Sequence, residues 1–370
     1  MTERTERVPA ASPGGPRLGR RGLLTLAGLA TLPAACSREP AAEAAPPAPA
    51  SLASPAPVSS IAPAATTTLP SSASASPSAS ASKAAKAPPV SHGGGPVPFK
   101  SGQVRLGAWL SLSGKSLSQS LALRRQQLGR DYGIVHIFCA WNEHFERPAI
   151  GDSTLMISWT GIKYAEINNG SNDSVIAAAA RNLAGQGKPT LLRWGWEMNG
   201  DWFEWDGTHN GQDTAGFIKA WKRMHGIFRD EGADNVAWNW SPNWNSGPNV
   251  SWNKMQRYYP GDAYVDWVGV SAYNFDGESP KTLLTPIVSG YGGRKPIIIS
   301  ETASIDHGGN TKANWIGDLS AYVRATPQIG ALCWFDTDTQ SDSAHNFRID
   351  TSSASLAAFR TMARTSRFAG

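Results

Sequence analysis

The sequence has little of what metal sites and several common catalytic motifs require. Its seven histidines are scattered through 370 residues without the spacing of metal ligands, so we predict neither a metal site nor a cofactor. WEMNG (196–200) lacks the two histidines of a zinc protease, and no Gly-x-Ser-x-Gly turn occurs. SGKS (113–116) has Trp109 where a phosphate loop needs glycine. These absences exclude the commonest zinc, serine-nucleophile and nucleotide sites.

The net charge is also small outside the N-terminal stretch of residues 1–98. The whole chain carries +5 at pH 7, with a pI near 9.1. Residues 1–98 hold 8 of the 34 Lys and Arg and 4 of the 29 Asp and Glu, so the remainder has a net charge of only +1. No nucleic-acid partner is predicted from this balance.

The N-terminal apolar run, GLLTLAGLATLPAAC (22–36), is shorter than the roughly 18 residues that span a bilayer. It follows Arg20 and Arg21, a pattern similar to a twin-arginine export signal. Cys36 resembles the lipidated cysteine of a bacterial lipoprotein, although Pro33 stands where such signals carry Leu. We therefore expect export to the cell surface or medium, with membrane anchoring if Cys36 is lipidated. The alternative is a short buried helix.

Residues 37–98 consist mostly of Ala, Pro and Ser and contain almost no large apolar side chain. Such a segment cannot bury enough surface to offset the entropy of ordering, so we predict a disordered linker. The globular domain is expected over residues 99–370. Two further cysteines, Cys139 and Cys333, lie there in apolar strand-like runs. The sequence leaves open whether they are buried thiols or bridged.

Eight short apolar runs in the domain are typical of strands. They cover residues 104–110, 134–141, 154–160, 190–197, 235–242, 265–273, 295–302 and 330–336. Helical patterns separate most of them, most clearly at 172–187, 213–233 and 311–326, and one at 353–365 ends the chain. Strands alternating with helices eight times predict a closed (β/α)₈ TIM barrel. An open doubly wound sheet is the main rival. The weakest helical pattern is at 143–150.

Two glutamates end predicted strands, Glu197 the fourth and Glu301 the seventh. In such a barrel the chemistry lies at the C-terminal strand ends. Because side chains alternate along a strand, each predicted strand should turn one set of residues inward. The expected sets are Leu191, Arg193, Gly195 and Glu197; Gly269, Ser271 and Tyr273; and Ile297, Ile299 and Glu301. This pattern would bring four side chains together at the C-terminal end of the barrel, here called the mouth: Arg193, Glu197, Tyr273 and Glu301.

Paired carboxyl groups with different protonation states are what the cleavage of a glycosidic bond requires. The aromatic residues of RWGWEMNGDWFEW (193–205) would raise the pKa of Glu197 and suit it to donate a proton. Arg193 and Tyr273 would favour an ionised Glu301, as a nucleophile needs. The 15 tryptophans all follow residue 98 and offer flat faces on which sugars stack, although core packing would also explain many of them.

The stretch 193–205, together with the later IIISETAS (297–304), resembles the signature of glycoside hydrolase family 26. The resemblance covers about residues 100–365 and implies a retaining (β/α)₈ enzyme, similar to β-mannanases with lichenase and β-1,3-xylanase relatives. It also implies that Glu197 is the proton donor, that Glu301 is the nucleophile and that Tyr273 contacts the nucleophile. Trp196 departs from the pattern, because mannanases of the family carry His there.

The resemblance and the neighbouring residues give a predicted substrate-binding set. Its members are Arg193, Trp196, Asn199, Trp202, Trp205, Tyr273 and Trp334. Trp202 and Trp205 would form aromatic walls, and Trp334 a platform under the sugar at the cleavage point. We expect a monomeric hydrolase of β-linked polysaccharide, with mannan first and lichenan or β-1,3-xylan behind it.

Several alternatives remain open at this level. A catalytically silent saccharide-binding protein of the same fold would keep the tryptophans and need neither glutamate. Glu197 would also serve as a structural ion-pair partner of Arg193, and Glu301 as an ordinary strand-end acid. Other acids near the predicted mouth are Asp206, Asp276, Asp336 and Asp338. We expect most of them to be turn residues and one or two to contact sugar hydroxyls. Glu143, which follows the second predicted strand, is a distant catalytic candidate.

Overall fold

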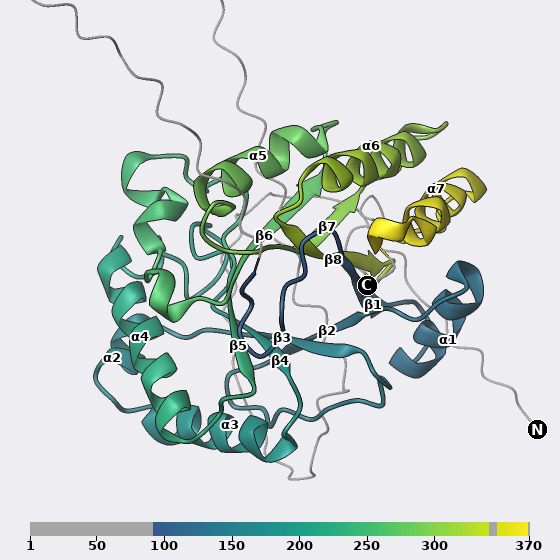
Figure 1. The fold of residues 1–370 in the computed structure, drawn as a ribbon. Coiled ribbons are helices and arrows are strands. Elements are labelled where there is room, and N and C mark those ends of the chain that lie inside the picture. Colours follow the sequence, from purple (N-terminus) through teal and green to yellow (C-terminus); the bar gives the residue numbers. More distant parts are fainter. Residues whose placement is uncertain (1–91, 340–345, 369–370) are drawn as a thin grey trace, which may run out of the picture. The chain divides into compact units, whose positions relative to one another are not determined.

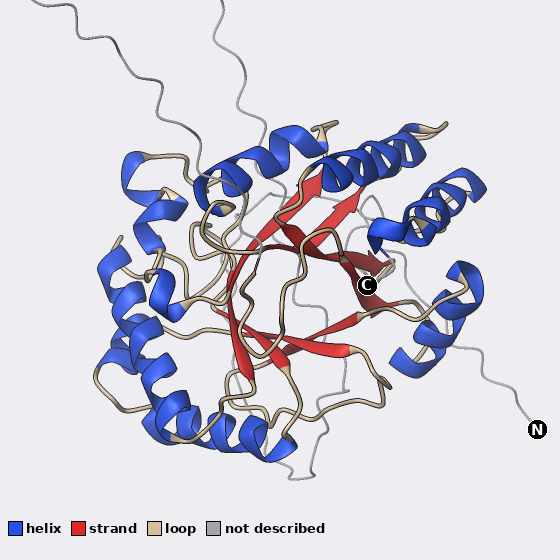
Figure 2. Ribbon diagram, viewed as in Figure 1, coloured by secondary structure: helices blue, strands red, loops and turns tan. Residues whose placement is uncertain are grey.

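The folded part of the chain is a closed barrel of eight parallel strands (Figure 1). The computed structural model describes residues 92–339 and 346–368, so the predicted export signal, Cys36 and nearly all of the linker lie outside the described residues. The strands pair in chain order, and the last pairs with the first along seven residues. Figure 2 shows the helices as an outer ring around these strands. The predicted (β/α)₈ barrel is confirmed, and the open sheet is excluded.

All eight predicted strands are present. They are β1 (Arg105–Ser111), β2 (Ile134–Cys139), β3 (Thr154–Trp159), β4 (Thr190–Trp194), β5 (Val236–Trp240), β6 (Trp267–Asn274), β7 (Ile297–Ser304) and β8 (Ile329–Thr337). Their sequences are apolar almost throughout, because strands of a parallel barrel are buried both by the interior and by the surrounding helices. The largest difference is at β4, which ends three residues before Glu197.

Within the described ranges, seven α-helices of five to 17 residues cover the strands. They are α1 (Leu117–Leu128), α2 (Tyr164–Asn168), α3 (Asp173–Gln186), α4 (Thr214–Asp230), α5 (Pro280–Tyr291), α6 (Thr311–Ala325) and α7 (Ser353–Arg364). The weak pattern at 143–150 forms no helix, and 3₁₀ turns replace a helix between β5 and β6: η1 (Ser251–Asn253), η2 (Met255–Tyr258) and η3 (Asp262–Tyr264). A last 3₁₀ turn, η4, spans Ser366–Phe368. None of the helices in the described ranges is long and apolar enough to cross a bilayer.

The barrel wall separates two apolar cores. The inner core comprises Val97, Phe99, Ile134, Met156, Leu191, Ala237, Trp267, Ile298, Ala331 and Cys333. The larger outer core lies between the strands and the helices and includes Cys139. Both cysteines are therefore buried thiols on opposite sides of the wall, which answers the question that the sequence left open.

The segment before β1 belongs to the inner core, so the folded unit begins earlier than residue 99. Val97 is 1% exposed, and the Trp267 indole donates to the carbonyl oxygens of Gly94 and Val97 at 3.1 and 3.0 Å. Gly94 has a φ of +90°, and a Cβ there would lie 2.4 Å from the Val97 carbonyl oxygen. The glycines that look like the end of a linker are thus required by a tight turn that closes the bottom of the barrel.

Phe99→Ala is expected to lower the free energy of unfolding by about 3 kcal/mol, because it removes a ring that is 5% exposed and packs edge-on against Trp267 at 5.9 Å. Guanidinium unfolding followed by tryptophan fluorescence measures the change. The neighbouring exposed Lys100→Ala is the control and should unfold with the wild-type midpoint. An unchanged midpoint for Phe99→Ala would show that the segment does not seal the barrel.

Candidate active site

Glu197 reaches the barrel mouth through a turn and not along a strand. β4 ends at Trp194, and Gly195 and Glu197 both have left-handed backbone conformations, with φ values of 53° and 55°. The Glu197 amide donates to the Ser241 carbonyl at 2.9 Å, and its own carbonyl accepts from the Gly200 amide at 2.8 Å. The predicted inward alternation therefore holds for Leu191 and Arg193 but is wrong for Glu197. A left-handed non-glycine residue is strained, and such strain is common at functional sites.

Glu301 is turned inward by an irregularity in β7. Val270 pairs with Ile299 and Ser271 pairs with Glu301, so Ser300 is an extra residue in β7. Ile298 belongs to the inner core, whereas Ile297 and Ile299 belong to the outer core. The prediction that Ile297, Ile299 and Glu301 share one face is therefore wrong. The bulge reverses the alternation just before Glu301 and aims its carboxylate at the mouth.

Arg193, Tyr273, Glu197 and Glu301 do meet at this mouth, as predicted. The Arg193 Nη1 atom forms an ion pair with Glu301 Oε1, and the Tyr273 hydroxyl donates to Glu301 Oε2 at 2.6 Å. The indole of Trp202 donates to Glu197 Oε2 at 2.9 Å. Glu197 is 2% and Glu301 4% exposed, so both carboxyl groups are shielded and both have specific partners. The alternative of Glu301 as an ordinary strand-end acid does not explain two donors converging on it.

The two glutamates have different electrostatic surroundings. Burial, followed by the charge of Glu301, raises the pKa of Glu197 to about 7, although Arg193, Ser271 and Trp202 oppose the shift. Burial and the Glu301 charge also raise the pKa of Tyr273 well above its usual value, so this hydroxyl stays a proton donor to Glu301. The mouth therefore holds one carboxyl group whose pKa lies near neutral pH beside a second that accepts from both Arg193 and Tyr273.

Three of the predicted binding residues are buried and contact other residues of the site instead of lining the cleft. Trp196 is 5% exposed and lies over Arg193, with 5.4 Å from the guanidinium carbon to its ring centre. Trp205 is 4% exposed, and its indole donates to the Trp196 carbonyl at 2.7 Å. Asn199 is fully buried, accepts from the Asn243 amide at 2.8 Å and donates to the Asn243 carbonyl at 3.0 Å. Asn199 thus holds the loop after β5 and has no exposed surface for a sugar.

Trp334 is not brought to the mouth, so its predicted role as a platform is wrong. It is fully buried in the outer core, between Trp315 of α6 and Phe359 of α7, with ring-centre distances of 6.1 and 5.3 Å. The next residue, Phe335, faces inward, where it stacks on Trp109 at 4.2 Å and meets Tyr273 edge-on at 5.6 Å. Side chains alternate along β8, so Trp334 points away from the barrel interior that Ala331 and Cys333 face.

A cleft opens from Glu197 between the loops that follow β5 and β6. Its lining residues are Glu197, Trp202, Asn243, Trp244, Asn245, Ser246, Gly247, Tyr273, Phe275, Asp276 and Glu278. Trp244 and Phe275 are half-buried aromatic residues that the sequence did not single out. Together with the half-buried Trp202, they offer flat apolar surface beside a proton donor, which is the surface that a sugar ring needs.

The other acids near the mouth have structural partners. Asp336 is fully buried and pairs with Arg124 at 2.7 Å, and Asp338 pairs with Arg348 at 2.9 Å. Glu143 is exposed and accepts from the Ala140 amide at 2.8 Å. Asp338 and Asp206 behave as the expected turn residues, and Asp206 accepts from the Phe203 and His209 amides. Asp336 instead lies within β8, and Asp276 lines the cleft. Within residues 92–339 and 346–368, no three His, Cys, Asp or Glu side chains gather as metal ligands would.

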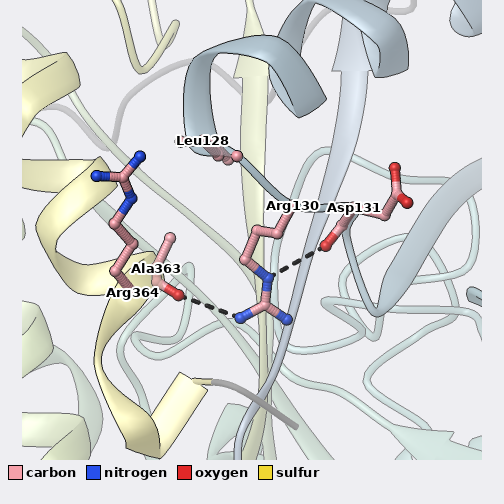
Figure 3. A pocket seen from close by; sticks show the side chains of 6 residues that line it. Leu128, Arg130, Asp131, Ala363 and Arg364 are labelled. Atoms are coloured by element: carbon pink, nitrogen blue, oxygen red, sulfur yellow. Dashed lines mark hydrogen bonds between the residues drawn. The ribbon is translucent and has the colours of Figure 1, made fainter.

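A second depression lies where α1 and α7 end (Figure 3). Its lining residues are Leu128, Gly129, Arg130, Asp131, Ala363 and Arg364. The Arg130 guanidinium donates to the carbonyl oxygens of Asp131 and Ala363 at 3.2 and 3.1 Å. It therefore ties the two helix ends together, and none of the predicted catalytic residues lines this depression.

Trp202→Phe should shift the basic limb of the pH profile of kcat/KM upward by roughly half to one pH unit. The indole N–H stabilises the ionised form of Glu197, so its loss raises the pKa of that carboxyl group further. Initial reaction rates between pH 5 and 9 measure the limb. Trp205→Phe loses an indole that donates to a backbone carbonyl and not to Glu197, so its limb should stay in place. A downward shift in Trp202→Phe would contradict the assignment of Glu197 as the acid.

Comparison with known proteins finds a family model that matches more than half of the chain. A model described as Glycosyl hydrolase family 26 matches residues 133–345. Endoglucanase H of Acetivibrio thermocellus is 33% identical over 284 residues, which cover 71% of this chain and 30% of that protein. A mannan endo-1,4-beta-mannosidase of Bacillus subtilis is 29% identical over 216 residues, which cover 52% of this chain and 54% of the relative. The chain thus spans less than two thirds of either relative.

The barrel also resembles solved structures. A family 26 β-mannanase from Bacteroides ovatus superposes with a TM-score of 0.56 over 72% of this chain and 90% of that one. The two sequences are 16% identical, so the likeness is one of fold.

Proposed function

Because the chain belongs to glycosyl hydrolase family 26, we propose that it is a retaining hydrolase of β-linked polysaccharide. The observation that carries the proposal is the pairing of a raised pKa at Glu197 with a Glu301 carboxylate held by Arg193 and Tyr273. Retaining hydrolysis needs one protonated and one ionised carboxyl group. The aromatic cleft beside Glu197 is suited to the departing part of the chain.

The proposed reaction has two steps. Glu301 attacks the anomeric carbon while Glu197 protonates the glycosidic oxygen, so the C–O bond breaks and a glycosyl ester of Glu301 forms. Esterification removes the Glu301 charge, which is the second largest cause of the raised pKa of Glu197. The pKa of Glu197 then falls, so the ionised Glu197 accepts a proton from water as the water attacks the anomeric carbon. Glu301 is released as a carboxylate and Glu197 regains its proton.

The identity of the polysaccharide is the second part of the proposal. The two relatives are named as an endoglucanase and a mannan endo-1,4-beta-mannosidase, so β-linked glycans of different sugars fit the family. We place mannan first, with lichenan and β-1,3-xylan behind it. Trp196, at the position where mannanases of the resembled family carry His, packs against apolar rings and Arg193. The non-mannan glycans therefore belong in the test.

Product release from mannan, lichenan, β-1,3-xylan and cellulose tests the function directly. The full chain is compared with a Glu197→Gln/Glu301→Gln double variant on each glycan. Products from one glycan that appear only with the wild type would support the hydrolase and identify its substrate. Binding to a glycan without products from either protein would instead indicate the catalytically silent saccharide-binding protein.

The first product formed should have the β configuration. A double displacement inverts the anomeric carbon twice, so the configuration of the β-linked glycan is retained. Proton NMR during the first minutes of hydrolysis distinguishes the β anomer from the α anomer before they equilibrate. Initial release of the α anomer would mean single displacement by water and would remove Glu301 from its role as nucleophile.

A further inference from the structure

A chain of hydrogen bonds continues from Arg193 into the barrel interior. Arg193 on β4 donates from Nη1 to Ser158 Oγ on β3 at 3.0 Å. Ser158 Oγ lies 2.7 Å from Nε2 of His136 on the adjacent strand β2. The three side chains are at most 1% exposed, and they come from successive strands of the barrel wall. Neither Ser158 nor His136 was predicted from the sequence or used in the mechanism above.

Donor and acceptor chemistry orients this chain. A guanidinium group only donates, so Ser158 Oγ must accept from Arg193. The Ser158 hydrogen is then satisfied only if Nε2 of His136 accepts it, which puts the ring proton on Nδ1. Between Ser158 and His136, this tautomer leaves one polar group, the Nδ1–H, without a partner within the described residues. The opposite tautomer would leave both Nδ1 and the Ser158 hydrogen unpaired. Burial, with a further contribution from the Arg193 charge, lowers the pKa of His136 well below its usual value, so the ring is neutral.

Ser158 and Ser271 accept hydrogen bonds from the two terminal nitrogens of the same guanidinium group. Arg193 Nη2 donates to Ser271 Oγ at 2.6 Å, while Nη1 is shared by Ser158 and Glu301. The remaining donor, Nε, has no hydrogen-bond partner in the described part of the chain. The orientation of Arg193 toward Glu301 therefore depends on these two hydroxyl groups. The Ser271 hydroxyl also acts on Glu197, whose pKa it lowers, so Ser158 is the anchor on the side away from the proton donor.

We propose that Ser158 and His136 are positioning residues that hold Arg193 in register with the Glu301 carboxylate. This inference rests on the proposed glycosidase function, and it assigns a role to two residues that do not contact the substrate. Glu301 is aimed at an anomeric carbon by Arg193 and Tyr273, so a guanidinium group free to rotate would misalign the attacking oxygen. Small displacements of reacting groups cost rate more than they cost binding.

Steady-state kinetics of the full chain test the role on the glycan that the wild type cleaves. Ser158→Ala should lower kcat by about 10-fold and change KM by less than about 2-fold. His136→Leu should lower kcat by about 5-fold, whereas His136→Gln, whose amide oxygen can accept at the position of Nε2, should stay within about 2-fold of wild type. The Ser158→Ala/His136→Leu double variant should be no slower than Ser158→Ala, because His136 acts only through Ser158.

Ser153→Ala is the matched control. Ser153 is a buried serine whose hydroxyl donates to the Tyr132 carbonyl at 2.7 Å, outside this chain of contacts. It should lose stability to a similar extent and keep the wild-type kcat. A wild-type kcat in Ser158→Ala would overturn the proposal. So would losses that multiply in the double variant, or a His136→Gln variant as slow as His136→Leu.

The tautomer of His136 gives a readout that needs no substrate. Long-range ¹⁵N–¹H NMR of the full chain at pH 6 should show a neutral ring protonated at Nδ1, assigned by its absence from His136→Gln. In Ser158→Ala this tautomer should no longer be fixed. A ring protonated at Nε2, or at both nitrogens, would overturn the proposed chain. A wild type that cleaves no glycan would instead overturn the proposed function, and the NMR result would still decide for or against the hydrogen-bond chain.

Discussion

Glu301→Gln is expected to lower kcat on the cleaved glycan by on the order of 10⁴-fold. An amide of the same size can still accept from Tyr273, but it cannot attack an anomeric carbon to form an ester. The ion pair with Arg193 is also lost, which leaves a fully buried guanidinium group without its counter-charge. The variant should therefore be both inactive and less stable, and kcat must be measured at a temperature where circular dichroism shows it folded.

Glu143→Gln is the matched control for that loss. It removes a carboxylate at the same end of the barrel, yet Glu143 is exposed and accepts a hydrogen bond from the nearby Ala140 amide. We expect its kcat to stay within about 2-fold of wild type. A Glu301→Gln variant that retains a tenth of the wild-type rate while folded would show that another group forms the bond to the sugar.

The architecture could be predicted because the same sequence pattern, a short apolar run, occurs once for each of the eight strands. Each barrel strand is buried on both faces, so each appears in the sequence as a short apolar run such as IVHIFC in β2. Eight such runs with helices between most of them leave few topologies. The two glutamates could be placed at the mouth for the same reason, because both follow an apolar run directly.

The local geometry of the site could not be predicted, because it comes from departures from strand regularity. The extra residue Ser300 is defined only by the pairing of β7 with β6, and nothing in IIISETAS marks it. The left-handed turn at Glu197 is fixed by hydrogen bonds to Ser241 and Gly200, one of them distant in the chain. The assumption of perfect alternation placed Glu301 correctly at the barrel mouth. It was wrong in placing Ile297 and Ile299 on the same inward face.

The aromatic residues show a second limit of prediction from the sequence. Tryptophan is both a sugar platform and a core residue, and the sequence does not say which face of the wall it joins. One residue of register separates Trp334, in the outer core, from Phe335, which faces Tyr273. Ser158 and His136 were missed because a buried serine and a buried histidine carry no motif. Only their shared contact with Arg193 distinguishes them.

Glu197→Ala is expected to lower kcat/KM on the polysaccharide by about 10²- to 10⁴-fold, since the departing sugar oxygen loses its proton donor. An aryl glycoside of the same oligosaccharide with an acidic phenol needs little protonation, so its first step should be far less affected. The ester on Glu301 should then accumulate, because no base activates water. A burst of phenol followed by a slow steady state would show this directly.

Azide separates this role from a structural one. The small anion fits in the space left by the carboxyl group and attacks the ester without needing a base, so it should accelerate turnover of the aryl glycoside in Glu197→Ala. The product should be the β-glycosyl azide, because the second displacement again inverts the carbon. Glu197→Gln keeps the side-chain volume and should show little acceleration. If azide had no effect on Glu197→Ala, or gave the α-glycosyl azide, then Glu197 would not be the acid and base of a double displacement, and its raised pKa would reflect burial beside Glu301 alone.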